Sequence, residues 1–132
     1  MNTICARFDL FPDNTGLGIT FTHSNYDFSS KDLTSAIAVN ESSGEKGITI
    51  RPPGISVILI TTVDYVAFRV GIWDSHPIDV IARDANGIII NQNTINGHNH
   101  YLDSSISGVG SKSIDFETIG NEELLVSICI NI

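Results

Sequence analysis

Residues 65–72 read Tyr65-Val66-Ala67-Phe68-Arg69-Val70-Gly71-Ile72, with a large apolar side chain at every even-numbered position. Alternate side chains of an extended strand point to opposite faces. This spacing therefore places Val66, Phe68, Val70 and Ile72 on one face. A period of two indicates a half-buried β-strand rather than a helix.

The same pattern recurs on both sides of this segment. Pro77–Arg83 and Ser113–Thr118 alternate in the same way. Ile55–Ile60 and Leu124–Ile132 are instead continuously apolar, which predicts central strands covered on both faces. Shorter strands are expected at Ile4–Phe11, Leu17–Thr22, Ser35–Val39, Gly47–Ile50, Gly87–Asn91 and Leu102–Ser107.

Turn-forming residues separate the expected strands. Asp84-Ala85-Asn86-Gly87 favours a hairpin turn, because Asn and Gly tolerate positive φ. Arg51-Pro52-Pro53-Gly54 must interrupt a ladder, since proline has no N–H to donate. Gly108-Val109-Gly110 predicts another break, and Ser42–Gly47 and Asn96–Asn99 are expected to be loops.

The number and spacing of these segments predict the fold class. About ten short strands with turns roughly every 8–12 residues are typical of a sandwich or barrel. No sustained 3.6-residue period occurs, which limits helix to a turn near Ser30–Ser35 or Gly120–Leu124. The chain has 132 residues, the usual size of one domain. We expect one all-β domain over residues 1–132, an antiparallel β-sandwich of the jelly-roll type with little or no helix.

The chain is acidic, with a formal net charge of −8 from 15 Asp and Glu against 7 Lys and Arg. Its scattered basic residues argue against nucleic acid and against an anionic membrane surface. No apolar run reaches the roughly 18 residues of a membrane span. Residues 1–7 lack the features of a signal peptide. We therefore expect either a cytoplasmic protein or an excised domain of an extracellular or cell-surface protein.

From Gly47 onward, the order of features resembles a known group of folds. A Gly-Ile-x-Ile strand precedes Pro-Pro-Gly-Ile, a Pro-led strand ends in Asp84-Ala85-Asn86-Gly87, and Ile114-Asp115-Phe116 precedes the apolar Leu124–Ile132. This order, over the last two-thirds of the chain, resembles the galactose-binding-like jelly rolls of bacterial carbohydrate-binding modules and related surface domains. The resemblance implies a jelly roll first and carbohydrate binding second.

The resemblance also implies a calcium ion, because jelly rolls of this type often hold one near the chain ends. Asp9, Asp13, Glu122 and Glu123 could contribute oxygen ligands to it. Calcium takes about six to eight such ligands, and no Asp-x-Asp-x-Asp-Gly loop is present. A calcium site at Asp9, Glu122 and Glu123 is therefore an expectation from the resemblance alone.

The segment Gly71–Pro77 contains the only Trp of the chain, followed by Asp74 and His76. A flat aromatic ring can pack on the apolar face of a sugar, and carboxylate or imidazole groups can bond its hydroxyls. Trp73, Asp74 and His76 are therefore candidate ligand-binding residues. The alternative is that Trp73 caps the core and Asp74 starts a turn.

A second candidate segment ends at Tyr101. His98 and His100 lie two positions apart, so both project to one side of an extended segment. There they could share a transition metal or, with Asn99 and Tyr101, form a ligand-binding surface. A solvated polar loop is the alternative.

The two cysteines, Cys5 and Cys129, fall in the first and last expected strands. Terminal strands are adjacent in many sandwiches, and a disulfide there would close a very long loop. Two buried thiols are the alternative, expected in a reducing compartment.

Catalytic motifs are absent: the chain has no Gly-x-Ser-x-Gly elbow, P-loop or His-Glu-x-x-His. We therefore expect no enzyme but a lectin-like carbohydrate-binding module, whose site is formed by loops around Trp73 and His98–Tyr101. The alternative is an assembly domain of a homo-oligomer or larger particle, with a protein surface as partner. A metal-dependent enzyme using His98 and His100 is a third hypothesis.

Overall fold

Antiparallel β-strands and their connections account for the architecture. The computed structural model describes residues 2–97 and 99–132, and no helix occurs among them. The strands are β1 (Thr3–Arg7), β2 (Gly16–Gly18), β3 (Thr20–His23), β4 (Tyr26–Ser30), β5 (Ile37–Ser42), β6 (Glu45–Ile50), β7 (Gly54–Ile72), β8 (Ile78–Arg83), β9 (Ile89–Ile95), β10 (His100–Glu117) and β11 (Glu123–Asn131).

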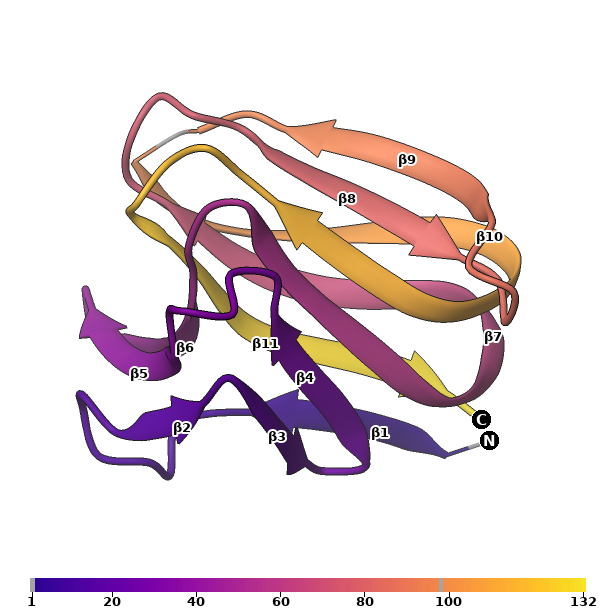
Figure 1. Cartoon of the computed structure of the whole chain (residues 1–132), viewed down its shortest axis with the longest axis horizontal. Helices are drawn as coiled ribbons and strands as arrows, with labels where there is room; N and C mark the ends of the chain where they lie inside the picture. Colours follow the sequence, from indigo (N-terminus) through magenta and orange to yellow (C-terminus); the bar gives the residue numbers. More distant parts are fainter. Residues whose placement is uncertain (1, 98) are drawn as a thin grey trace.

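Two sheets share the long strands β7 and β10 (Figure 1). Near its start β7 pairs with β4 and with the last residues of β10, which pair in turn with β8. With β3 and β9 at the edges, these strands form the first sheet. Near its end β7 pairs with the first residues of β10 and with β11, whose other side pairs with β6 and β1. Strands β5 and β2 complete this second sheet.

The alternating apolar positions meet in one core between the sheets. Val66, Phe68, Val70 and Ile72 are all buried, as their spacing predicts. Phe68 from the second sheet meets Phe116 from the first edge-on, with ring centroids 5.3 Å apart. Burying each such side chain contributes about 1.5–3 kcal/mol. The expected all-β sandwich is confirmed.

Two features of the long strands differ from expectation. Gly108–Gly110 does not break β10, because the β7–β10 ladder continues through register shifts between Ser107 and Ser113. Bulges of this kind let a strand bend without ending. Ile55–Ile60 is not covered on both faces: Ile58 and Ile60 are 42% and 50% exposed, whereas the alternate residues Ile55, Val57 and Leu59 are buried. The continuous apolar sequence of this strand therefore does not mean that both of its faces are buried.

The expected turns are confirmed in two places and tighter in a third. Asp84 closes the β8–β9 hairpin, since its carbonyl accepts from Gly87 N at 3.0 Å and its carboxylate from Asn86 N at 2.9 Å. The Pro52–Pro53 segment separates β6 from β7. The expected loop Ser42–Gly47 shrinks to the two residues Ser43 and Gly44, both at positive φ. Such turns match the twist of paired strands.

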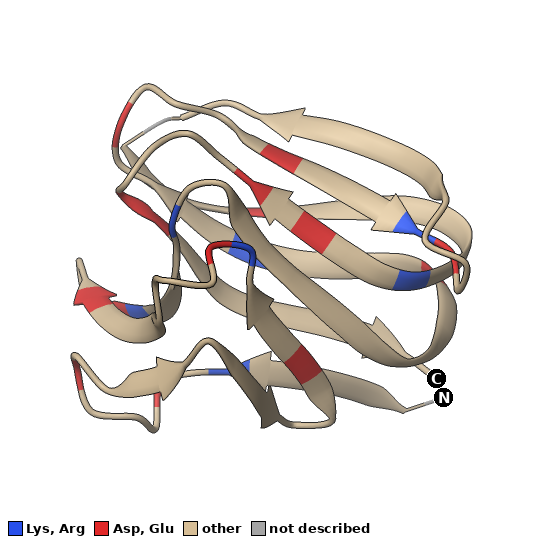
Figure 2. Ribbon diagram, in the orientation of Figure 1, with Lys and Arg blue, Asp and Glu red and all other residues tan. Residues whose placement is uncertain are grey.

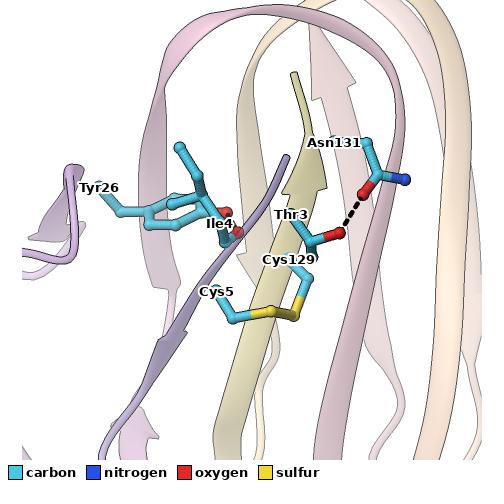
Figure 3. Close-up of a disulfide and its surroundings, with 6 residues drawn as sticks. All are labelled: Thr3, Ile4, Cys5, Tyr26, Cys129 and Asn131. Carbon is cyan, nitrogen blue, oxygen red and sulfur yellow. Dashed lines mark hydrogen bonds between the residues drawn. A yellow bond between two sulfur atoms is a disulfide. The ribbon is translucent and has the colours of Figure 1, made fainter. Parts of the chain in front are cut away.

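Strands β1 and β11 bring the chain ends together (Figure 1). Cys5 lies opposite Cys129, and a disulfide joins them with 4.1 Å between the Cα atoms (Figure 3). Beside it, the Thr3 hydroxyl donates to Asn131 Oδ1 at 2.7 Å. Of the two states that the sequence left open for the cysteines, the structure has the bonded one.

The charged residues are spread over many elements rather than gathered in one patch (Figure 2). The outer face of the first sheet holds one buried charge, Asp115, which is 4% exposed. Lys31 Nζ and Arg83 Nε lie 2.9 and 3.0 Å from its Oδ2 atom. The described residues include no helix capable of crossing a lipid bilayer.

Candidate functional site

Three loops meet at the end of the sandwich opposite the chain termini (Figure 1). They are residues 73–77 between β7 and β8, residues 96, 97 and 99 between β9 and β10, and residues 118–122 between β10 and β11. Trp73 N donates to the Glu122 carbonyl at 3.4 Å. Gly97 lies so close to the first loop that a Cβ there would be 2.3 Å from the Asp74 carbonyl oxygen. The fold thus joins the two segments singled out in the sequence and adds a third.

The indole of Trp73 lies over the outer face of the second sheet. Phe68, Val70 and Ile72 of β7 face the core, so Gly71 faces outward. A Cβ on Gly71 would lie 2.1 Å from Trp73 Cζ3 and 2.7 Å from Tyr101 Cε1. Only glycine leaves room for both rings at this position, and the indole is left half-buried.

Tyr101 holds this arrangement from the neighbouring strand. Its ring stands at 83° to the indole, with centroids 4.6 Å apart. Its hydroxyl donates to the Ser42 carbonyl at 2.6 Å, with the Glu45 carbonyl at 3.1 Å. Burial, with the charge of Glu45 adding to it, raises the pKa of Tyr101 to about 12. The ring is therefore anchored at its hydroxyl end and against the indole.

Arg69 completes the support of Tyr101. Its guanidinium carbon lies 5.3 Å from the centre of the Tyr101 ring. Nε and Nη2 donate to the two carboxylate oxygens of Glu45 at 2.8 and 2.7 Å, and Nη1 lies 3.2 Å from Asp103. A guanidinium fixed by two parallel hydrogen bonds is a rigid neighbour. Tyr101 is therefore held in place by Arg69 and by its hydroxyl contacts, and it packs against Trp73.

Trp73 lines a hollow of about 460 Å³. This hollow, called the Trp73 hollow below, lies between the second sheet, the loop before β2 and the start of β11. Its lining includes the amides of Asn14, Asn40 and Asn121. The acidic residues Asp13, Glu41, Glu122 and Glu123 also line it. No Lys or Arg is among its lining residues within the described chain.

The other sequence candidates that the structure describes (Asp74, His76, Asn99, His100 and Tyr101) are not among the residues that line this hollow. Asp74 Oδ1 accepts from His76 N at 2.9 Å, so Asp74 starts a turn, as the alternative interpretation had it. Asn99 and His100 are exposed at the start of β10. His98 lies outside the described residues. The structure therefore brings Trp73 into ring contact with Tyr101, and connects Asp74 to His76 by a hydrogen bond.

Glu123 forms a carboxyl pair with Asp74. Burial, and after it the hydrogen bond and charge of Asp74, raise the pKa of Glu123 to about 8. Burial opposes ionisation of Asp74 too, but hydrogen bonds with Glu123 and His76 outweigh it and lower the pKa of Asp74. At neutral pH, Glu123 therefore carries the proton and Asp74 the negative charge.

The carboxylates expected to bind calcium do not form one cluster. Within residues 2–97 and 99–132, no group of three or more His, Cys, Asp or Glu side chains is arranged to hold a metal ion. Asp9 lines a separate hollow with Arg7 and Lys46, whereas Glu122 and Glu123 line the Trp73 hollow. A shared site of Asp9, Glu122 and Glu123 therefore has no support in the structure.

Most of the hollow was not predicted from the sequence. Asn14, Asn40 and Asn121 come from the loop before β2, from β5 and from the β10–β11 loop. No local pattern connects them, because their proximity depends on strand pairing across the second sheet. Of the lining residues, the sequence singled out Trp73 for ligand binding, whereas Asp13, Glu122 and Glu123 were considered only as calcium ligands.

The fold described above is that of the β-sandwich carbohydrate-binding modules. The chain is similar to a family 29 carbohydrate-binding module from Piromyces equi, with a TM-score of 0.55 and 8% identity over 99% of this chain and 93% of that one. A variant of another family 29 module, complexed with mannohexaose, has a TM-score of 0.53 and 12% identity over 98% of this chain and 87% of that one. The C-terminal family 6 module of a marine laminarinase from Zobellia galactanivorans has a TM-score of 0.51 and 9% identity over 99% of this chain and 100% of that one.

No protein-family model matches the sequence, and no curated protein matches it either. At the identities given above, structural likeness shows the fold alone. The jelly-roll resemblance suggested by the sequence is confirmed at that level.

Proposed function

We propose that the chain is a non-catalytic carbohydrate-binding module whose ligand occupies the Trp73 hollow. The observation that carries the proposal is a half-buried tryptophan that lines a hollow together with three asparagines and four acidic residues. A volume of about 460 Å³ falls within the range of about 300–1,000 Å³ usual for small-ligand sites.

The lining matches the two kinds of surface on a sugar ring. The apolar C–H face of a pyranose can pack on the indole of Trp73. Its hydroxyls both donate and accept, and so do the amides of Asn14, Asn40 and Asn121. Because Tyr101 already holds the indole, little side-chain entropy remains to be lost on binding.

The charge of the hollow favours neutral sugars over anionic ones. Asp13, Glu41 and Glu122 line it without a basic partner in the lining. A uronate or sulfate group would meet like charges there. The structural likeness to a module that was complexed with mannohexaose supports a neutral glycan as ligand, by analogy of fold.

Titration calorimetry against neutral oligosaccharides such as mannohexaose, cellohexaose and laminarihexaose tests the proposal, with oligogalacturonate as the anionic comparison. We expect Trp73→Ala to lower the association constant at least tenfold, and Asn40→Ala or Asn121→Ala to lower it several-fold, about 1 kcal/mol per lost hydrogen bond. Tyr65→Ala is the matched control, since Tyr65 is an exposed aromatic residue on β7, the strand that precedes Trp73, and does not line the hollow.

Unchanged affinity in Trp73→Ala would remove the hollow as the binding site. A monodisperse oligomer in sizing chromatography, with no affinity for any glycan, would instead support the alternative assembly role.

A further inference from the structure

Two carboxyl groups converge beside Gly120 at the loop end of the sandwich. A Cβ on Gly120 would lie 2.2 Å from Glu123 Oε1 and 2.5 Å from Asp74 Oδ2. Glu123 is 1% exposed, and its register places it opposite Ile50 of β6 and Ile72 of β7. A core-facing carboxyl group therefore meets a carboxyl group from another loop.

The hydrogen-bond pattern around Glu123 leaves one oxygen for a proton. Its Oε2 atom accepts from Glu122 N at 2.8 Å. Its buried Oε1 atom has no donor among the described residues. Two ionised carboxylates that share one buried site repel each other strongly. A proton on Glu123, donated toward Asp74, removes the repulsion and satisfies the buried oxygen.

This pair lies directly beside a backbone link to Trp73. Trp73 N donates to the Glu122 carbonyl, and the next residue of each segment supplies one member of the carboxyl pair. The β7–β8 loop is thus joined to the start of β11 by adjacent main-chain and side-chain bonds. Separation of the carboxyl groups would strain the backbone link and move the indole.

We propose that the proton shared by Asp74 and Glu123 is a latch that holds the β7–β8 loop against the start of β11, and that its loss in alkaline solution displaces Trp73. The latch requires no ligand, so it stands or falls independently of carbohydrate binding.

The groups that face the pair come from its own two loops and from the neighbouring elements. His76 Nδ1 lies 3.4 Å from Asp74 Oδ2. Glu122 adds a negative charge beside Glu123. From β6 and β7 the opposing side chains are Ile50 and Ile72, and the β9–β10 loop contributes Gly97 against Asp74. Burial, together with the hydrogen bond and charge of Asp74, raises the pKa of Glu123 to about 8, so loss of the proton can be followed at mildly alkaline pH.

Trp73, the only tryptophan, reports on the latch by its fluorescence. The emission of the ligand-free protein is measured from about pH 6 to 9.5, below the range where a tyrosine of ordinary pKa, about 10, is mostly ionised. We expect a one-proton transition with a midpoint near 8 in the wild type, and a flat profile in Glu123→Gln, whose amide can still donate to Asp74.

Asp74→Asn is the second test, because it removes the charge that opposes ionisation of Glu123. We expect its midpoint to fall below that of the wild type. Glu122→Gln and His76→Gln are matched controls, and we expect both to keep the transition. A flat wild-type profile would overturn the latch, and so would an unchanged transition in Glu123→Gln. If Glu123→Gln failed to fold, as judged by circular dichroism, the direction of the Asp74→Asn shift would decide.

Discussion

The indole of Trp73 stands edge-on to the ring of Tyr101, with 4.6 Å between the ring centroids. Both rings lie next to Gly71, in space that the Cβ of any other residue would occupy. Strand pairing creates this contact, because Tyr101 of β10 lies opposite Gly71 of β7. The candidate binding ring is therefore placed by a long-range ladder and not by its own loop alone.

Gly71→Ala should displace both rings, since the new Cβ would lie 2.1 Å from Trp73 Cζ3. We expect a stability loss of about 1–3 kcal/mol from overpacking and a red shift of tryptophan emission. Glycan affinity, if the hollow binds sugar, should fall at least tenfold. Gly16→Ala is the control, since nothing lies within 4 Å of its added Cβ. Normal emission in Gly71→Ala would show that the rings can adjust.

The disulfide between Cys5 and Cys129 closes almost the whole chain, with a sequence separation of 124. Replacing both cysteines by serine should lower the free energy of unfolding by about 4–5 kcal/mol in the chain-entropy model. Chemical denaturation of the oxidised wild type and the double variant measures the difference. A reductant should weaken the wild type only. Equal stability of the two proteins would mean that the pairing of β1 with β11 suffices without the bond.

Asp115 should act as a buried anchor for two cations. Burial opposes its ionisation, but hydrogen bonds from Lys31, Arg83 and Ser56 outweigh burial and lower its pKa. A lowered folded-state pKa contributes stability above the unfolded value of about 3.9, and this is lost as pH falls through the folded value. We expect Asp115→Asn to cost roughly 2 kcal/mol at neutral pH, less than for a fully buried pair because both cations reach solvent.

Acid denaturation of the wild type and Asp115→Asn checks this prediction. The difference in their free energies of unfolding should shrink below about pH 4. Asp79→Asn is a suitable control, because Asp79 is an acid on the neighbouring strand β8, bonded to Thr94. A difference that stays constant down to pH 2 would show that Asp115 contributes through packing and not through its charge.

Glu123 should have the opposite effect on the pH dependence of stability. Its folded-state pKa of about 8 lies above the unfolded value of about 4.3, so the folded state binds the extra proton between these limits. Stability should therefore fall as pH rises through that range. Relative to the wild type, Glu123→Gln should gain stability by up to about 1.4 kcal/mol per pH unit there. Urea denaturation at several pH values measures this gain, and parallel profiles would contradict it.

The alternation of Val66, Phe68, Val70 and Ile72 was enough to predict the sandwich, because the side-chain direction of a strand is a local property with a period of two. Turn residues such as Asn86 and Gly87 act locally too. Strand β4 was missed because it offers only two apolar positions, and the continuity of β10 was missed because a bulge depends on the partner strand.

Trp73 was recognised as chemically suitable from its residue type, but its surroundings were not. Asn14, Asn40 and Asn121 become neighbours only through the order of strands in the second sheet. The charge of Glu123 likewise depends on burial opposite Ile50 and Ile72, which no local pattern encodes. Local backbone geometry thus determined the strands and most turns. Proximity and desolvation, which arise only when distant segments pack, decided the lining of the hollow and the raised pKa of Glu123.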